Sequence, residues 1–442
     1  MTDRPDDAGR SYRRREVLAT LGVTGFVGCL GGDESTPTET AEPTATPVQT
    51  ETATATPTPS EETPTQTPQD ETSPTPESTP TPQQEPERDW MYHQGPRNHG
   101  MVQSPESNPP SGGLTEKWQF EADGKIRTAP AVVGDTVYFG TDGGTVYAVD
   151  TEGSERWSVG SGDTVRSSPA VVDGTVYVGM DNNRLAAFDA ESGSELWTFD
   201  TLGPVRTAPK VVDGTVYFGC DDRSVYTVDA ADGSQRWTHE TRGKARSSPA
   251  VTSDHVYVGK DDNTLYQLDI ADGSKIWTFD TEQWIRSAPV VGDGTVYFGT
   301  TDGDHTTAKG SLYAIDTRFG ETEWVFDEPN DIADSPVLVD GTLYAVDLND
   351  RVWSVDAASG RENWSFNTFN RIFASATYVS GYLYVTRFDG VLSVFSENGS
   401  RQATFSTATG QAFRSTPAVH DGTVYVGCDD RHLYALAEPS VD

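Results

Sequence analysis

Six arginines recur at matching places along the chain, and they are the residues whose type and spacing could do chemistry. Each stands three positions before a proline or its equivalent in a repeated segment, and they are Arg127, Arg166, Arg206, Arg246, Arg286 and Arg414. A guanidinium group binds carboxylates and other anions through paired hydrogen bonds. If the repeated segments surround one axis, these arginines form a ring that binds an anion. The alternative is that each arginine pairs with a nearby carboxylate, such as Asp200 or Asp280, and ties neighbouring units together.

Other motifs that could bind a ligand are less specific. The stretch DGDHTT offers Asp302, Asp304 and His305, which could ligate a cation, but a solvated acidic loop accounts for so short a motif and no metal site is predicted. The Asp that recurs in GMDNN, GCDDR and GKDDN is interpreted as a turn residue. Asn363 and Asn398 begin sequons and are candidates for glycosylation outside the cell. No catalytic triad, phosphate-binding loop or zinc-ligand spacing is recognised in the sequence.

The arginines belong to a repeat of about 40 residues that returns eight times. The prolines that mark it are Pro130, Pro169, Pro209, Pro249, Pro289, Pro336 and Pro417, with Ala376 in the remaining place. The tryptophans that mark it are Trp118, Trp157, Trp197, Trp237, Trp277, Trp324 and Trp364, with Ala403 in the remaining place. Two independent markers therefore give the same number of units.

Each repeat has the pattern of four short strands. Alternating β-branched and aromatic residues, as in PAVV and TVYVG, are separated by Asp-Gly pairs such as Asp173-Gly174, which favour the positive φ of a tight hairpin. Proline cannot donate a hydrogen bond within a sheet, so its recurrence in the first strand places that strand at a sheet edge, facing a central channel. The pattern predicts an all-β fold, an eight-bladed β-propeller with four-stranded antiparallel blades.

The two ends of the array predict how the ring closes. The array opens with a single fourth strand at 116 to 120 and ends after a third strand at 432 to 437. The opening strand can complete the last blade, a 1+3 closure that leaves only short, protected edges. The repeated tryptophan follows a glycine by four residues, as Trp197 follows Gly193, and is expected to fill the gap between neighbouring blades.

Residues 1–32 have the pattern of an export signal. RRREVL contains Arg14 and Arg15 and resembles the twin-arginine export motif, and FVGC resembles a lipobox, in which Cys29 becomes lipidated after cleavage. Phe26 departs from the lipobox, where leucine is usual. The apolar run is too short for a comfortable membrane-spanning helix. A plain membrane anchor or an uncleaved signal is the alternative.

Three further regions follow this signal. Residues 33–87 contain no aromatic residue, lysine or arginine, and their Thr, Pro and Glu predict a disordered stalk that could carry O-linked sugars. Residues 88–115 form a lead-in segment, and residues 116–442 form the propeller.

The charge of the chain excludes one class of partner. The formal net charge is −36, from 68 acidic and 32 basic residues. No cluster of lysine and arginine follows the N-terminus, so nucleic acid, which requires a concentrated cationic surface, is not expected as a partner. An excess of carboxylates is typical of halophilic proteins, which stay soluble in strong salt. Cys220 and Cys428 fall on different repeats and are expected to be buried and unbridged.

The seventh repeat departs from the pattern at four marker positions, which hold Phe373, Ala376, Ser396 and Ala403. Aromatic residues and arginine are enriched at protein interfaces. The residues around these departures are therefore a candidate partner surface, made of Phe369, Arg371, Phe373 and Tyr378. Drift of the repeat without a functional cause is the alternative.

The repeat resembles that of a known family. The pattern Asp-Ala-x-x-Gly-x-x-x-Trp, as in DAESGSELW, DAADGSQRW and DAASGRENW, is similar to the PQQ-like propeller repeat, and DWMYHQGPRNHG at 89 to 100 is similar to the segment that often precedes such propellers. The resemblance implies one of two functional classes. Quinoprotein dehydrogenases oxidise alcohols or sugars with pyrroloquinoline quinone (PQQ) and Ca²⁺, whereas BamB-type envelope lipoproteins are non-catalytic scaffolds.

The sequence favours the scaffold class. The resemblance implies that a dehydrogenase would have an adjacent cysteine pair and long insertions that roof the cofactor, and this chain has no Cys-Cys and only one short insertion, in the fifth repeat. We therefore expect a monomeric, lipid-anchored propeller on the outer face of the cytoplasmic membrane, which binds an envelope protein and needs no cofactor. A dehydrogenase that uses PQQ and calcium is the alternative. A ligand sensor that uses the channel mouth as its receptor is a further alternative.

Overall fold

The computed structural model describes residues 101–102, 113–303, 310–327, 330–332 and 334–439. Contacts along the chain divide it into two units, Met1–Pro80 and Thr81–Asp442, and the second unit contains every described residue. Arg14, Arg15 and Cys29 of the export signal, the stalk and most of the lead-in segment lie outside the described residues.

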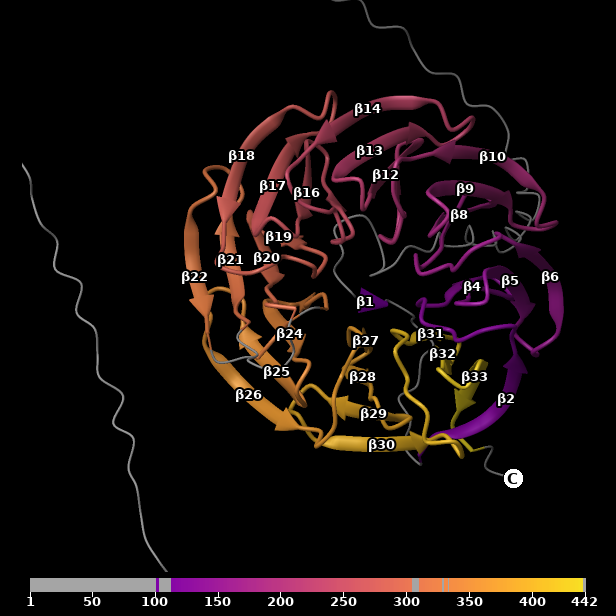
Figure 1. The fold of residues 1–442 in the computed structure, drawn as a ribbon. Coiled ribbons are helices and arrows are strands. Elements are labelled where there is room, and N and C mark those ends of the chain that lie inside the picture. The colour runs from indigo at the N-terminus through magenta and orange to yellow at the C-terminus, as the bar shows by residue number, and fades with distance from the viewer. Residues whose placement is uncertain (1–100, 103–112, 304–309, 328–329, 333, 440–442) are drawn as a thin grey trace, which may run out of the picture. The chain divides into compact units, whose positions relative to one another are not determined.

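Eight sheets follow one another around a ring (Figure 1). Blade one contains β3 (Ala131–Val133), β4 (Thr136–Gly140), β5 (Thr145–Asp150) and β6 (Glu155–Gly160). Blade two contains β7 (Ala170–Val172), β8 (Thr175–Met180), β9 (Arg184–Asp189) and β10 (Glu195–Asp200). Blade three contains β11 (Lys210–Val212), β12 (Thr215–Gly219), β13 (Ser224–Asp229) and β14 (Gln235–Glu240). Blade four contains β15 (Ala250–Val251), β16 (His255–Gly259), β17 (Thr264–Asp269) and β18 (Lys275–Asp280).

The second half of the ring repeats this order. Blade five contains β19 (Val290–Gly292), β20 (Thr295–Gly299), β21 (Leu312–Asp316) and β22 (Thr322–Phe326). Blade six contains β23 (Val337–Val339), β24 (Thr342–Val346), β25 (Arg351–Asp356) and β26 (Glu362–Asn367). Blade seven contains β27 (Thr377–Val379), β28 (Tyr382–Thr386), β29 (Val391–Ser396) and β30 (Arg401–Ser406), joined by β1 (Met101–Val102). Because consecutive strands of a blade are antiparallel neighbours, the predicted eight-bladed propeller is confirmed.

Blade eight joins the two ends of the array. It contains β31 (Ala418–His420), β32 (Thr423–Gly427) and β33 (His432–Ala437), and its outer strand is β2 (Thr115–Glu121). β2 runs antiparallel to β33, with Trp118 opposite Ala435 and Glu121 opposite His432. The predicted 1+3 closure is therefore confirmed, and it leaves no open end in the ring of blades.

The predicted hairpins form at the Asp-Gly pairs. Asp173 and Gly174 join β7 to β8 and both have positive φ, 49° and 72°. Left-handed backbone at two successive residues matches the twist of the flanking strands. These turns set the register of the two inner strands in the five blades that have an Asp-Gly pair.

Each repeated tryptophan packs against the next blade. The Trp157 ring of blade one lies against Gly193 of blade two so closely that a Cβ on Gly193 would stand 2.7 Å from it. The Trp157 indole N–H also donates to the Ala190 carbonyl at 2.9 Å. Trp197 makes the same two contacts with Gly233 and Ala230 of blade three. The prediction that tryptophan fills the gap between blades is therefore confirmed.

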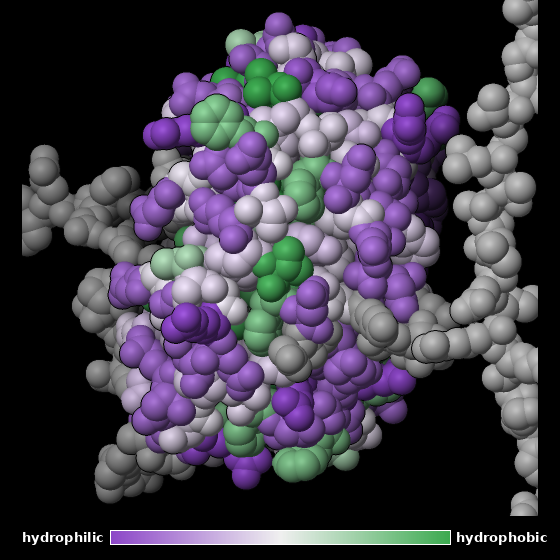
Figure 2. All heavy atoms as spheres, turned by 90° about the vertical axis from the view of Figure 1, so that its left-hand side faces the viewer, coloured by the Kyte–Doolittle hydropathy of each residue, from purple (hydrophilic) through white to green (hydrophobic). Residues whose placement is uncertain are grey.

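The inner strands carry the core, and the outer strands face solvent. In β4 every residue is buried, whereas exposed residues predominate in β6. On the side of the ring at the left of Figure 1, hydrophilic side chains predominate and hydrophobic ones are scattered in small groups (Figure 2). Cys220 and Cys428 are both buried and unbridged, as expected. Among the described residues, no helix has the length and apolar character that crossing a membrane requires.

Candidate functional site

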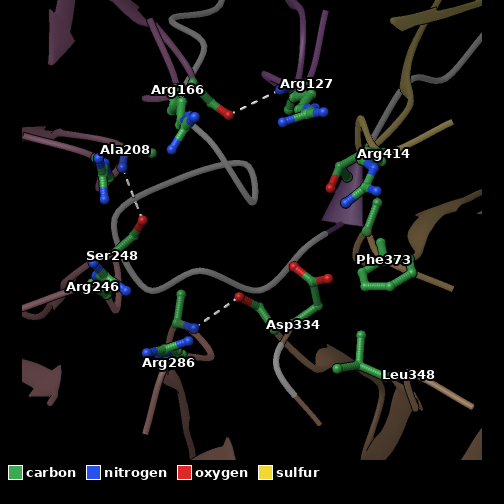
Figure 3. Close-up of a pocket in the computed structure, with 17 residues that line it drawn as sticks. Arg127, Arg166, Ala208, Arg246, Ser248, Arg286, Asp334, Leu348, Phe373 and Arg414 are labelled. Carbon is green, nitrogen blue, oxygen red and sulfur yellow. Dashed lines mark hydrogen bonds between the residues drawn. The ribbon is translucent and has the colours of Figure 1, made fainter. Parts of the chain in front are cut away.

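All six predicted arginines line one pocket of about 460 Å³ at one end of the channel (Figure 3). Each comes from the segment that connects the outer strand of one blade to the inner strand of the next, as Arg166 lies between β6 and β7. Because this segment occupies the same place in every repeat, residues that share one repeat position form a ring around the channel. We call this pocket the channel mouth.

The arginines are held by aspartates from the loop between the second and third strands of blades one to four and eight. Arg206 binds Asp181 of blade two through two hydrogen bonds of 2.8 and 3.0 Å, and its Nη1 lies 3.2 Å from Asp221 of blade three. Arg246 in turn binds Asp221 through bonds of 2.9 and 2.8 Å. Ion pairs link the other four arginines to the same series of aspartates. Arg127 pairs with Asp142 and Asp429, and Arg166 pairs with Asp142 and Asp181. Arg286 pairs with Asp261, and Arg414 pairs with Asp429.

The charges in this arrangement stabilise one another. The Asp221 side chain is only 5% exposed, and its burial acts to raise its pKa. The hydrogen bond and charge of Arg246, with those of Lys244, outweigh that effect and hold the Asp221 pKa below its usual value. The pKa of Arg246 is raised by its hydrogen bond to Asp221, so both groups stay ionised at neutral pH.

One interpretation of individual aspartates is wrong, and another is incomplete. Asp200 and Asp280 do not pair with the ring: Asp200 binds Arg184, and Asp280 accepts a hydrogen bond from Thr264. The recurring Asp of GMDNN, GCDDR and GKDDN is more than a turn residue, because Asp181, Asp221 and Asp261 are the carboxylates that bind the arginines. In the repeats that carry both residues, the aspartate and the arginine recur at fixed positions. This shared spacing is the sequence signal that could have identified the ion pairs.

The alternation of charges stops across blades five to seven. The aspartate position is occupied there by Thr301, Leu348 and Phe388, and in blade seven the arginine position is occupied by Phe373. The Arg414 guanidinium, at one end of the charged arc, stands over the rings of Phe373 and Phe388, 4.9 and 4.8 Å from their centroids. The channel mouth therefore has a charged arc, made of the six arginines and their aspartates, and an aromatic sector, made of Phe373, which lines the pocket (Figure 3), and Phe388, which packs on Phe373.

Asp334 is the carboxylate that lines the pocket within this sector. It is partly exposed, and its Oδ1 accepts a hydrogen bond of 3.4 Å from the Ser375 hydroxyl. Desolvation raises the Asp334 pKa to about 7, and the Ser375 bond opposes this only in part. Sequence reasoning missed this residue because it occupies a repeat position that holds Ser or Thr in six of the other seven blades.

The structure divides the candidate partner residues of blade seven. Phe369 is 85% exposed, and Arg371 is also exposed. The Arg371 carbonyl accepts a hydrogen bond from the Phe388 N–H, and Phe388, itself 39% exposed, packs on Phe373 with centroids 5.3 Å apart.

Tyr378 does not belong to this surface. It is 7% exposed, because its ring stacks on Tyr344 of blade six and its hydroxyl donates to Glu397. We define the blade-seven surface as Phe369, Arg371, Phe373 and Phe388.

The remaining candidate positions are apart from the channel mouth. Asn363 and Asn398 are exposed, on β26 and on the turn between β29 and β30. Asp302 donates its backbone N–H to the Asp331 carboxylate, and Asp304 and His305 lie outside the described residues. In the part of the chain that the structure describes, no cluster of three or more His, Cys, Asp or Glu side chains could hold a metal ion.

Comparisons with known proteins agree with this fold. A family model described as outer membrane protein assembly factor BamB matches residues 108–160, 142–249 and 241–438. No curated protein matches the sequence.

Several solved structures share the fold at low identity. BamB from Moraxella catarrhalis has a TM-score of 0.62 at 17% identity, over 73% of this chain and 99% of that one. The computationally designed Ika8 protein has a TM-score of 0.64 at 17% identity, over 73% and 99% of the two chains. The quinohemoprotein alcohol dehydrogenase ADHIIG from Pseudomonas putida HK5 has a TM-score of 0.67 at 14% identity, over 80% and 82%. At these identities the similarity shows the fold alone.

Proposed function

Because the chain belongs to the family of outer membrane protein assembly factor BamB, with its PQQ-like repeats, we propose that it is a non-catalytic scaffold of the cell envelope that binds a protein partner. The family match supports the scaffold class and leaves both the class of function and the binding surface to be argued from the residues. Solved structures with this fold include both an assembly factor and dehydrogenases, so the choice between a scaffold and an enzyme rests on the residues of the channel mouth.

The observation that carries the proposal is the blade-seven surface, of which Phe373 also lines the channel mouth. The arginines of the charged arc are bound to aspartates, so their charges are largely compensated within the ring. The blade-seven surface instead presents three exposed side chains from one stretch of blade seven and its preceding loop: Phe369 at 85%, Phe388 at 39%, and Arg371. Exposed aromatic rings beside arginine are the usual anchors of a protein interface.

The residues of the channel mouth do not fit PQQ with calcium. Ca²⁺ takes six to eight oxygen ligands, usually with several carboxylates among them. The carboxylates of the charged arc are bound to arginines, and Asp334 is the carboxylate that lines the pocket itself. No oxygen-rich cluster for calcium is therefore formed by the described residues of this pocket.

A crosslinking experiment tests the partner surface. Phe369 would be replaced by a photoreactive phenylalanine analogue in intact cells, with Leu202 as the matched control because it occupies the equivalent loop of blade three and is 89% exposed. We expect a discrete envelope protein to be crosslinked from position 369 and not from position 202. Equal labelling from both positions, or none from either, would contradict the proposal.

A cofactor titration tests the alternative enzyme. Purified protein would be incubated with PQQ and Ca²⁺, and bound quinone absorbance and dye reduction with alcohols or sugars would be measured. We expect neither bound quinone nor turnover. A bound cofactor with turnover would make the dehydrogenase the better assignment.

We place the scaffold on the outer face of the cytoplasmic membrane as a monomer, exported by the signal at Arg14 and Arg15 and anchored by a lipid on Cys29. The Cys29→Ser variant should then move from the membrane fraction to the soluble fraction, because one side chain carries the anchor. Fractionation of cells followed by immunoblotting measures this. An unchanged membrane fraction for the variant would exclude lipidation at Cys29 as the anchor.

A further inference from the structure

Arg414 differs from the other arginines of the charged arc in what occupies the place of its principal aspartate. In blades two to four, one aspartate accepts two hydrogen bonds from the arginine 25 residues later, as Asp221 does from Arg246. The equivalent position of blade seven holds Phe388. The Arg414 guanidinium carbon lies 4.8 Å from the centroid of the Phe388 ring. Arg414 therefore has an aromatic contact where its counterparts have a carboxylate.

The hydrogen-bond donors of Arg414 are not used by the residues that the structure describes. Its Nε is buried and has no hydrogen-bond partner, although Asp429 lies 3.3 Å away as an ion-pair partner. Arg166 is also held by ion pairs alone, but it lies between Asp142 and Asp181, and these two carboxylates repel an anion. Arg414 is thus the arginine at which an added carboxylate meets the least repulsion.

Positive charge is in excess around Arg414. Asp429 is a single carboxylate with three cationic partners, Lys125 at 3.3 Å, Arg127 at 3.0 Å and Arg414 at 3.3 Å. Asp334 lines the same pocket as Arg414, but desolvation raises the Asp334 pKa to about 7, so this carboxyl is only partly ionised at neutral pH. Arg414 therefore attracts an anion into the channel mouth.

An apolar wall adjoins this cation. Phe373, Leu348 and Ala374 line the pocket of about 460 Å³ together with Arg414, and Figure 3 shows Phe373 and Leu348 on the same side of the pocket as Arg414. The Phe373 ring centroid is 4.9 Å from the Arg414 guanidinium carbon. A guanidinium that stacks on a ring keeps its N–H edge for two parallel hydrogen bonds to a carboxylate. A cationic edge and a hydrocarbon wall therefore meet in one pocket.

We propose that Arg414, Phe373 and Leu348 form a binding site for a small organic carboxylate with an apolar body. The ligand carboxylate accepts hydrogen bonds from the N–H edge of Arg414, and the apolar body packs against Phe373 and Leu348. The ligand supplies to Arg414 the carboxylate that the repeat itself supplies to Arg206 and Arg246. The ligand is a small molecule and no protein partner takes part, so this proposal stands or fails independently of the proposed function.

Isothermal titration calorimetry of the full-length protein with three probes tests the two halves of the site. Octanoate has both a carboxylate and an apolar body, acetate has only the carboxylate, and 1-octanol has only the apolar body. We expect octanoate to bind more tightly than either comparator by at least about tenfold, because only octanoate makes both sets of contacts. No binding of octanoate, or an affinity equal to that of either comparator, would overturn the proposal.

Replacing the arginine identifies the group that binds the carboxylate. Arg414→Gln should weaken octanoate binding by roughly tenfold or more, because it removes charge-assisted hydrogen bonds. Arg206→Gln is the matched control, since Arg206 is bound to Asp181 and Asp221 and lines the same pocket. We expect Arg206→Gln to weaken binding by less than about threefold, through loss of one more distant charge. Equal losses in the two variants would show that the whole ring and not Arg414 attracts the ligand.

Restoring the repeat at position 388 covers the case in which Arg414→Gln does not fold. Phe388→Asp introduces the aspartate found at this position in blades one to four and eight, and it should bind Arg414 in competition with the ligand. We expect octanoate affinity to fall by at least about tenfold while the propeller stays folded. Phe388→Asn, which removes the ring without adding a charge, should lose less than about threefold. Unchanged octanoate affinity in Phe388→Asp would contradict the site.

Discussion

At the scale of the residue, a contact between a tryptophan ring and a glycine couples seven of the eight blades to the next, and blade seven has Ala403 in place of the tryptophan. Two constraints favour glycine at this contact: the residue has a positive φ, and the tryptophan ring leaves no room for a Cβ. Gly193 has φ +70° and lies against Trp157, whereas Gly174 of the same blade has φ +72° and no atom within 4 Å of the place that a Cβ would occupy. The two glycines therefore separate backbone strain from loss of packing.

We expect Gly193→Ala to destabilise the protein by about 2 to 4 kcal/mol, because it adds a clash with Trp157 to the strain of a left-handed alanine. Gly174→Ala should cost only about 1 kcal/mol, the strain alone. Chemical denaturation of both variants measures the difference. Equal losses in the two variants would show that the Trp157 contact does not hold the blades together.

The burial of Lys260 should make the stability of the protein depend on pH. It is 0% exposed, and its Nζ has no hydrogen-bond partner among the described residues. Burial lowers the Lys260 pKa to about 7, against the opposing attraction of Asp262 and Asp222. Between pH 7 and the ordinary lysine pKa of 10.5, the unfolded chain binds a proton that the folded chain does not.

The free energy of unfolding should therefore rise with pH across this window through Lys260. In Lys260→Met, which keeps the volume and removes the charge, we expect greater stability at pH 7 and a smaller rise towards pH 10 than in the unmodified protein. Denaturation of both proteins at several pH values gives the comparison, and the difference between them isolates Lys260 from other titrating groups. Parallel pH profiles would contradict the assignment.

At the scale of the element, the loops of the channel mouth form a chain of ion pairs between blades. Asp221 accepts hydrogen bonds from Arg206, Arg246 and Lys244, which come from connecting segments on both sides of blade three. Its side chain is only 5% exposed, so removal of a partner leaves a buried carboxylate with less compensation. A surface pair such as Arg184 with Asp200, at 50% and 77% exposure, lacks this dependence.

We expect Arg246→Gln to destabilise the protein by about 1 to 3 kcal/mol and to raise the pKa of Asp221. Arg184→Gln should change stability by less than about 1 kcal/mol. Thermal unfolding monitored by circular dichroism measures both variants. If the Arg246→Gln variant is as stable as the Arg184→Gln variant but no longer binds an anion, the arginines act mainly in ligand binding and contribute little to the stability of the propeller.

At the scale of the whole molecule, the net charge of −36 makes repulsion between carboxylates a general cost of the folded state. Salt screens repulsion between exposed charges more than it screens the half-buried pairs of the channel mouth. We therefore expect the midpoint of thermal unfolding to rise as NaCl increases from about 0.1 M to about 2 M. Scanning calorimetry across this range measures the shift, and a falling midpoint would show that attractive ion pairs dominate the charge balance.

The architecture of the ring followed from local patterns. Asp-Gly pairs favour the positive φ of a tight turn, and proline is confined to a sheet edge. The array begins with one strand and ends with three, so these ends can complete one blade together. Each requirement acts within one repeat or between its neighbours, so the blade number, the closure through β2 and the packing of the tryptophans between neighbouring blades were all predictable. The six arginines share one repeat position, and the structure puts them around one pocket.

Contacts between different repeats had to be read from the folded chain. The sequence could not say whether the arginines meet Asp200 and Asp280 or the aspartates of another loop, because that depends on which loops share one end of the channel. Burial separated Tyr378 from Phe369, although the two lie in one short stretch of sequence. Periodicity therefore determined the ring and its closure, since strand propensity and turn chemistry are local. The closed geometry alone decided how charge is compensated, which side chains reach solvent and that β1 lies along blade seven, because each depends on groups that are distant in the sequence and adjacent only after folding.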